Sequence, residues 1–473
     1  MTILPPRDVP GGILEGMIVN SAEIQRFSRD IAQYLDRFAP LFGRRETRQW
    51  ARQYVSGLLM DMERKNCWQI AEARQIPARR LKSLQHFLYA SPWAWKPVLH
   101  EMGRLVDEHL ASDDGIVVVD ESGVRRWGEK SVGIARQYIG NVGKVENGQV
   151  GVYLTYASEQ GQAFLDARLF IPQEWFDDPR RCREAGIPRD VIFRTKPQLA
   201  AAMVEAARGR GLRARWLTAD EAYGSTPHFL DVVDAVGWWY VAEVKTDVQV
   251  WPVRPKVLPP SPRGAKGRPR QKPCLARKSD KSVPVAFLAA RLSEKDWRRI
   301  AVATGTQGRR VFDFAFLRVV EKRRGLPGRD AWLMVRRSLD QTPEIKYYLS
   351  NAPAGVDRER MAVVGSERWR VEGAIKEAKG QTGLDESEGR NWKHWHHHTT
   401  LSMLAHALLC CARVSWSKTH SPPVGAKDSE TRRPGAKGAA AGPRPGAALL
   451  RLAGPAHGPR PRLSHPPRRK SLD

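Results

Sequence analysis

Three carboxylates, Asp120, Asp220 and Glu372, have the residue types and the setting to hold divalent metal ions for phosphoryl transfer. Asp120 follows four apolar residues, 116–119, and Asp220 ends the short, mainly apolar run 216–219. Four apolar residues are too few for a helix and too uniformly apolar for a half-exposed strand, so we predict buried strands that stop at an aspartate on the sheet edge. A structural or capping role for such an aspartate remains an open alternative.

Glu372 is the candidate for the third carboxylate. We expect it on one amphipathic, basic helix from Asp357 to about Gly383, with Arg368 one turn before it and Lys379 two turns after it. These spacings place the three side chains on roughly one face, where the carboxylate could hold metal and the cations could hold DNA phosphates. Two divalent ions about 4 Å apart need shared oxygen ligands of this kind. The alternative is a solvated helix face with ion pairs.

Other acidic and imidazole side chains compete for this role. We discount the neighbours of the two aspartates, because adjacent residues on a strand point to opposite faces. The histidines look like a metal cluster, but consecutive helical residues cannot all face one ion, so packing and DNA contact are favoured over zinc. The competing side chains are Glu121, Glu221, Glu377, Asp385, Glu386, Glu388, His394, His396, His397 and His398.

Residues 21–110 have helical periodicity, and one part of them resembles a helix-turn-helix in layout. A short helix near 68–74 and a break at Pro77 precede a basic helix. Three cations at the start of that helix, Arg79, Arg80 and Lys82, would contact DNA phosphates. An ordinary helical bundle with a basic solvent face explains the same pattern equally well.

The charge balance indicates a nucleic-acid partner. The 473 residues include 78 Lys and Arg against 51 Asp and Glu, a net charge of +27, which is more than solubility requires. Nucleic acid is the first partner to expect and an acidic membrane the second. No apolar run approaches the roughly 18 residues of a membrane span, and the start lacks a signal-peptide pattern. We therefore expect a cytoplasmic, nucleoid-associated protein without a membrane partner.

The periodicity changes from helix to strand near residue 115 and back near 355, which predicts a mixed α/β chain. The Pro-, Arg- and Lys-rich stretch 251–284 cannot bury a core and is expected to be a loop. We divide the chain into a lead (1–20), a helical DNA-binding domain (21–110), a catalytic domain in two parts (111–236 and 355–416), a β-rich insertion (237–354) and a disordered basic tail (417–473).

Four separate motifs in order then resemble one family. They are VVVDESG, SVGIARQYIGNVGKVENGQVGV, LTADEAYG and the long segment that begins RWRVEGAIKEAKGQTGLDESEGR. Together they resemble the DDE transposases of bacterial insertion sequences, most closely the seven-hundred-and-one family, over roughly residues 27–414. The resemblance implies a ribonuclease-H-like catalytic domain, preceded by an all-helical domain and interrupted by a β-rich insertion between the second aspartate and the glutamate.

Carried over residue by residue, the resemblance makes Asp120, Asp220 and Glu372 the catalytic and metal-binding triad. Arg368 and Lys379 match the Arg-x3-Glu-x6-Lys part of a signature in which a Tyr normally stands at the position of Gly365. Only Glu372 among the acids of this region keeps the family spacing. The resemblance also implies two Mg²⁺ ions per site, with Mn²⁺ as a substitute, double-stranded DNA partners at the transposon ends and the target, and a homodimer on DNA.

Two further functions stay open from the sequence. One is a catalytically decayed or repurposed DNA-binding protein that still recognises inverted repeats, and the other is a metal-dependent nuclease that cuts without joining strands. The Ala-, Gly-, Pro- and Arg-rich tail departs from the family pattern, and we hypothesise a frameshift near Ser417.

Overall fold

The computed structural model describes residues 13–14, 17–18, 21–140, 142–261, 270–305 and 308–420. The short strands β1 (Ile13–Leu14) and β2 (Met17–Ile18) are the described part of the predicted lead. The predicted tail beyond residue 420, and with it most of the segment that the frameshift hypothesis concerns, lies outside these ranges.

Five strands form the centre of a mixed sheet in the order β6-β5-β3-β7-β8. The strand β3 pairs antiparallel with β5, β5 pairs antiparallel with β6, and β7 and β8 continue the sheet parallel to β3. This is the ribonuclease-H-like arrangement, so the predicted fold class is confirmed. The strands are β3 (Ile116–Arg125), β4 (Ala135–Ile139), β5 (Lys144–Ser158), β6 (Gly161–Leu169), β7 (Trp216–Ala219) and β8 (Trp239–Val244).

The apolar runs account for the buried centre of this sheet. Every residue of β7 and the first five residues of β3 are buried. The prediction that the first strand stops at Asp120 is wrong, because β3 continues to Arg125 and pairs antiparallel with β5 over its whole length. Residues 121–125 include three polar side chains and, apart from the buried Gly123, are partly or fully exposed; the backbone pairing with β5 keeps them in the strand.

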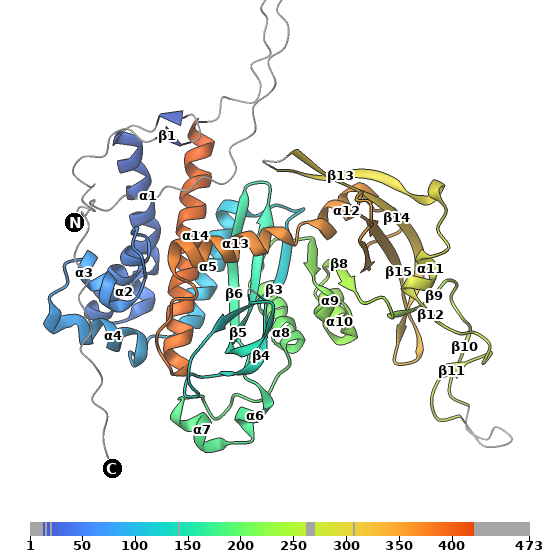
Figure 1. Cartoon of the computed structure of the whole chain (residues 1–473), viewed down its shortest axis with the longest axis horizontal. Helices are drawn as coiled ribbons and strands as arrows, with labels where there is room; N and C mark the ends of the chain where they lie inside the picture. Colours follow the sequence, from blue (N-terminus) through green and yellow to red (C-terminus); the bar gives the residue numbers. More distant parts are fainter. Residues whose placement is uncertain are drawn as a thin grey trace, which may run out of the picture.

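Helices follow the strands at the carboxyl ends of β6, β7 and β16. The helix α8 lies against β5 and β6, whereas α13 lies against β3 and β6 (Figure 1). These helices are α6 (Gln173–Phe176), α7 (Pro179–Glu184), α8 (Lys196–Gly209), α9 (Glu221–Gly224), α10 (Pro227–Ala235), α12 (Arg358–Ser366), α13 (Trp369–Thr382) and α14 (Trp392–His420). The single helix predicted from Asp357 to Gly383 is wrong: two turn residues, Glu367 and Arg368, divide it into α12 and α13.

The region between β8 and α12 extends the same sheet. The strand β16 pairs antiparallel with β8, and the order continues β16-β15-β14-β9-β12, with β13 alongside β14. Its elements are β9 (Gln249–Trp251), β10 (Val257–Leu258), β11 (Cys274–Leu275), β12 (Val283–Pro284), α11 (Val285–Ala289), β13 (Arg298–Gly305), β14 (Gly308–Arg323), β15 (Leu326–Arg337) and β16 (Ile345–Ser350), with the 3-10 turn η3 (Glu294–Asp296). Since β8 pairs in parallel with β7, we propose that the insertion begins after Val244, not at residue 237.

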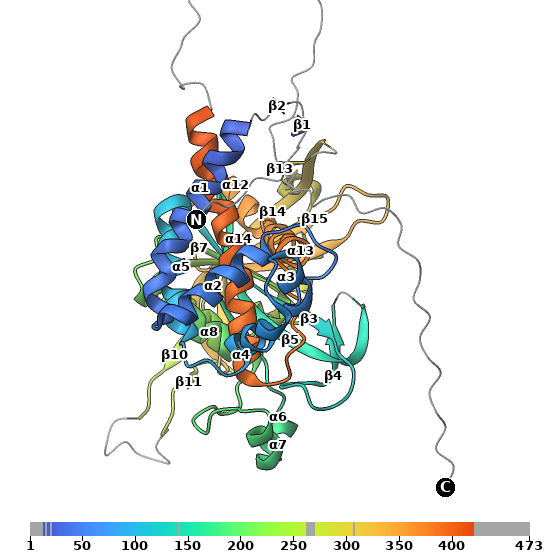
Figure 2. The same cartoon turned by 90° about the vertical axis from the view of Figure 1, so that its left-hand side faces the viewer.

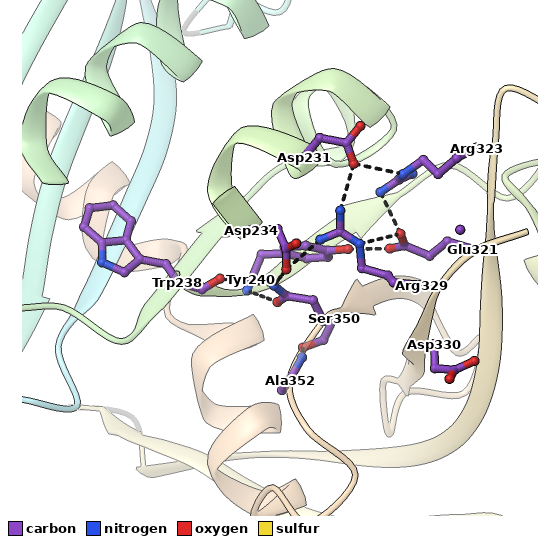
Figure 3. Close-up of polar contacts among 12 residues, drawn as sticks. Asp231, Asp234, Trp238, Tyr240, Glu321, Arg323, Arg329, Asp330, Ser350 and Ala352 are labelled. Carbon is purple, nitrogen blue, oxygen red and sulfur yellow. Dashed lines mark hydrogen bonds and ion pairs between the residues drawn. The ribbon is translucent and has the colours of Figure 1, made fainter. Parts of the chain in front are cut away.

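A buried ionic cluster joins this insertion to the core (Figure 3). Glu321 on β14 is 1% exposed, accepts a hydrogen bond from the Tyr240 hydroxyl of β8, and pairs with Arg323 at 2.7 Å. Arg329 on β15 reaches 3.5 Å from Glu321 and also pairs with Asp231 at 2.8 Å. Asp231 belongs to α10, so the cluster fixes α10, β8 and the insertion hairpin relative to one another.

The N-terminal helices pack around α14. In Figure 1 this long helix lies between α1 and α2 on one side and the sheet on the other, while α5 contacts both α14 and β6; Figure 2 shows these helices from the left-hand side of Figure 1. Tyr54 bonds to His398 at 2.8 Å, Tyr34 bonds to Ser415 at 2.8 Å, and α5 lies along α14. The N-terminal elements are α1 (Ser21–Phe38), η1 (Ala39–Phe42), α2 (Arg45–Leu58), α3 (Cys67–Ala73), η2 (Ala78–Arg80), α4 (Leu81–Tyr89) and α5 (Trp95–Leu110). Among the described helices, none combines the length and the apolar character that crossing a membrane requires.

Candidate active site

Asp120 and Asp220 stand side by side because of the register of two parallel strands. Val119 on β3 pairs with Ala219 on β7, and each aspartate is the next residue in its chain. Asp120 accepts a hydrogen bond from the Glu121 amide at 2.8 Å. Asp220 caps α9, accepting from the amides of Ala222 at 2.9 Å and Tyr223 at 3.3 Å. The capping role left open for Asp220 is therefore real, and it occupies only one carboxylate oxygen.

Arg368 links the third carboxylate to the aspartates. It directly precedes α13 without a side-chain capping bond, and its guanidinium lies 3.2 Å from Glu372 Oε1 and 3.8 Å from Asp220 Oδ2. The break between α12 and α13 thus puts Arg368 beside the aspartates instead of on a continuous helix face. Glu372 is 58% exposed, whereas Asp220 is 21% exposed, so the glutamate forms the solvent side of the group.

Burial makes the ionised form of Asp120 unfavourable. Removal from water raises its pKa to about 7, and the positive charge of Arg368 only partly opposes this effect. Tyr223 is also buried beside these acids; its pKa is raised well above its usual range, first by burial and then by Glu121, Asp220 and Asp120. Its hydroxyl has no hydrogen-bond partner within the described protein.

Sequence reasoning missed a fourth acid at this site, Glu243. It follows Ala242, which pairs with Ala219, so it continues the row of Asp120 and Asp220 on β8. Its negative charge, with that of Asp120, raises the pKa of Arg368 against the opposing effect of burial. The signal was present in the strand Trp239-Tyr-Val-Ala-Glu, but nothing in the sequence indicated that this strand runs parallel to β7.

The other predicted side chains lie apart from this group. Lys379 is half-buried, burial lowers its pKa, and the acid that affects it is Asp385 and not Glu372. Arg79 and Lys82 are exposed on η2 and α4, while Arg80 pairs with Glu46 at 3.5 Å and stacks on Trp50. Their contact with DNA stays a prediction.

The competing acids and histidines have other partners. Glu121 pairs with Lys196 at 2.8 Å, and Glu377 lies 3.4 Å from His406. Glu386 and Glu388 line a cavity of about 490 Å³ between α3, α4 and the chain before α14. The histidines predicted as packing are buried, and in the described ranges no three His, Cys, Asp or Glu side chains converge on a point that could hold a metal ion.

Gly365 occupies the position where the related signature has a Tyr, and packing explains the glycine. A Cβ atom there would lie 2.7 Å from Met334 Cε and 3.0 Å from Val241 Cγ1. A larger side chain at this position would require the flexible end of Met334, and also Val241, to shift. The contacts of that Tyr are therefore absent in this chain.

Comparison with known proteins gives two matches. The family described as DDE superfamily endonuclease matches residues 37–309, more than half of the chain, including Asp120 and Asp220 but ending before Glu372. A protein named probable transposase for insertion sequence element IS701, from Microchaete diplosiphon, is 30% identical over 192 residues. That match covers 40% of this chain and 47% of the relative, so the chain spans about half the length of the curated relative it matches. Both matches agree with the resemblance found in the sequence.

Proposed function

Because the chain belongs to the DDE superfamily of endonucleases, we propose that it is the DNA transposase of an insertion sequence. It would bind the terminal inverted repeats of its element, hydrolyse a phosphodiester at each end, and join the freed 3′-hydroxyl to target DNA. The observation that carries this proposal is the grouping of Asp120, Asp220 and Glu372 around Arg368 at one edge of a ribonuclease-H-like sheet. The printed name of the IS701 relative supports the same function.

The donor set fits divalent metal. Carboxylate oxygens are the hard ligands that Mg²⁺ and Mn²⁺ prefer, and a cation would remove the cost of ionising Asp120. Two bound ions would activate water and stabilise the charge on the leaving oxygen. Glu372 contacts Arg368 in this structure and does not converge with the aspartates, so its exposed side chain must turn toward them for the three to share a ligand.

Each residue then has a separate task in the proposed reaction. Asp120 and Asp220 hold the metal on a rigid sheet edge, where the strand register sets their spacing. Glu372 completes the ligand set from α13. Arg368, released from the carboxylates, is close enough to neutralise a phosphate at the same place. Lys379, Arg79, Arg80 and Lys82 would bind DNA away from the reacting bond, and a homodimer would bring two ends together.

The test is cleavage and joining of a labelled duplex that carries the element's own ends, with Mg²⁺. We expect the wild type to nick the end and to form joined products. Glu372→Gln keeps the size and the hydrogen bonds but removes a ligand charge, so it should lower both activities by at least about a hundredfold while DNA binding persists. Glu377→Gln, one and a half turns along the same helix, is the matched control and should stay active.

The products separate the competing functions. Nicking without joined DNA would indicate a nuclease that does not transfer strands. Binding without any cleavage by the wild type would contradict the transposase proposal and indicate a decayed DNA-binding relative.

A further inference from the structure

The row of acids at the candidate site continues into the insertion. Ala242 on β8 pairs with Ala219 on β7, so Glu243 lies in the row of Asp120 and Asp220. Glu243 in turn pairs with Tyr348 on β16. Paired residues on neighbouring strands face the same side of a sheet, and so do residues two positions apart on one strand. The row two positions farther along these strands therefore faces the same side as the acids.

That next row consists mainly of cations. Lys346 on β16 pairs with Arg336 on β15, Arg336 pairs with Phe314 on β14, and Phe314 pairs with Arg298 on β13. Lys245 directly follows β8, across from Lys346. We call Lys245, Lys346, Arg336 and Arg298 the cationic row. Its five strands, about 4.8 Å apart, give it a length of roughly 19 Å.

The cationic row has a surplus of positive charge. Lys346 pairs with Glu243 at 3.0 Å, and Arg336 pairs with Glu344 at 3.3 Å. Lys245 and Arg298 are exposed, and the described part of the chain provides neither with an ion-pair partner. The row thus contains four cations, and two acids form ion pairs with them.

The adjacent row on the opposite face of the same strands is balanced. There Arg299 pairs with Asp313 at 3.0 Å, and Arg337 pairs with Glu294 at 2.9 Å and with Asp313 at 3.3 Å. Two cations meet two acids. Of these two rows, the one on the face of the candidate active site has the surplus of cations.

The cationic row keeps a fixed place relative to the carboxylates. The backbone pairing of β8 with β16 makes the insertion part of the core sheet. The buried Glu321 cluster adds a second attachment through α10, which follows Asp220 in the chain (Figure 3). DNA that contacts the cationic row is therefore held at a fixed position relative to the carboxylates.

We propose that the cationic row binds the phosphates of duplex DNA that extends from the active site across the insertion. At about 3.4 Å per base pair, roughly 19 Å corresponds to five or six base pairs. The proposal rests on the proposed function, and it assigns to the insertion a sequence-independent grip on the DNA beside the cleaved bond.

The test is the salt dependence of binding by the full chain to a labelled linear duplex, without added divalent cation. Each lost phosphate contact reduces the slope of log Kobs against log salt by about 0.9. We expect Lys245→Gln with Arg298→Gln to reduce the slope by about 1.8, and Lys245→Arg with Arg298→Lys to keep it. Arg299→Gln, the adjacent residue on the balanced face, is the matched control and should leave the slope unchanged.

Thermal unfolding of each variant verifies that it is folded. If the double variant is unstable, Arg298→Gln alone replaces it, and we expect that single substitution to reduce the slope by about 0.9. An unchanged slope in a variant that folds, with a wild type that binds and cleaves DNA, would overturn the cationic row alone. A wild type that binds no duplex would overturn the proposed function and the cationic row together.

Discussion

The carboxylate of Asp120 is buried, so its negative charge is unfavourable unless a cation lies beside it. Burial raises its pKa from 3.8 to about 7, so the folded protein binds this proton more tightly than the unfolded chain does. By linkage, the contribution of Asp120 to stability is fully present below pH 3.8 and is lost as the pH rises through 7. With about 1.4 kcal/mol per pKa unit, the full loss is at most about 4 kcal/mol.

Asp120→Asn should therefore raise the free energy of unfolding at pH 8 in the presence of a chelator, and raise it less at pH 5. Adding Mg²⁺ should stabilise the wild type and have a smaller effect on the variant, because the variant lacks a ligand charge. Denaturant unfolding at the two pH values, with and without Mg²⁺, measures both effects. A variant that is less stable than the wild type at pH 8 without metal would contradict this account.

At the scale of elements, the sequence predicted what depends on local pattern. The apolar run 116–119, the helical spacing in 21–110 and the long helix near 395–416 all have counterparts in the structure. The break at Glu367 and Arg368 was missed, although the pair Gly365-Ser366 directly before it is a known cause of helix kinks. Glu367 is 5% exposed and pairs with Arg370 of α13. The contact of Arg368 with Asp220, and the place of Glu243, depend on strand pairing between distant segments.

The helix α14 shows how a polar run can be a core element. His398 is 1% exposed; one ring nitrogen lies 2.8 Å from the Tyr54 hydroxyl and the other 2.8 Å from the Gly383 carbonyl. A neutral ring satisfies both, donating to the carbonyl and accepting from the hydroxyl. Burial lowers the pKa of His398 to about 4, from 6.5.

This depressed pKa predicts a loss of stability in acid. Below 6.5 the unfolded chain takes up a proton that the folded chain excludes down to about 4, so stability falls as the pH falls. At pH 5 the loss should be about 2 kcal/mol relative to neutral pH. His398→Gln cannot titrate, so its difference from the wild type in unfolding free energy should shrink by that amount between pH 7 and pH 5. A difference that stays constant would mean that His398 does not titrate in this way.

For the whole molecule, the arrangement around α14 bears on whether residues 21–110 form a domain of their own. The helices α1, α2, α4 and α5 all contact α14, whose other side contacts β6. The buried apolar residues of the N-terminal helices and of the sheet form one continuous cluster. A helix that supplies the core of both parts cannot stay folded when one part is removed, because its apolar surface then faces water.

We therefore predict that a fragment of residues 111–420 loses its cooperative unfolding transition and binds an apolar dye. A fragment of residues 21–420 keeps every N-terminal helix, and it should unfold in one transition close to that of the full chain. Thermal unfolding followed by circular dichroism, with dye binding in parallel, measures both fragments. If residues 111–420 alone unfold cooperatively and bind Mg²⁺, the division into an independent DNA-binding domain and a catalytic domain is correct. In that case α14 serves the N-terminal helices only as a docking surface.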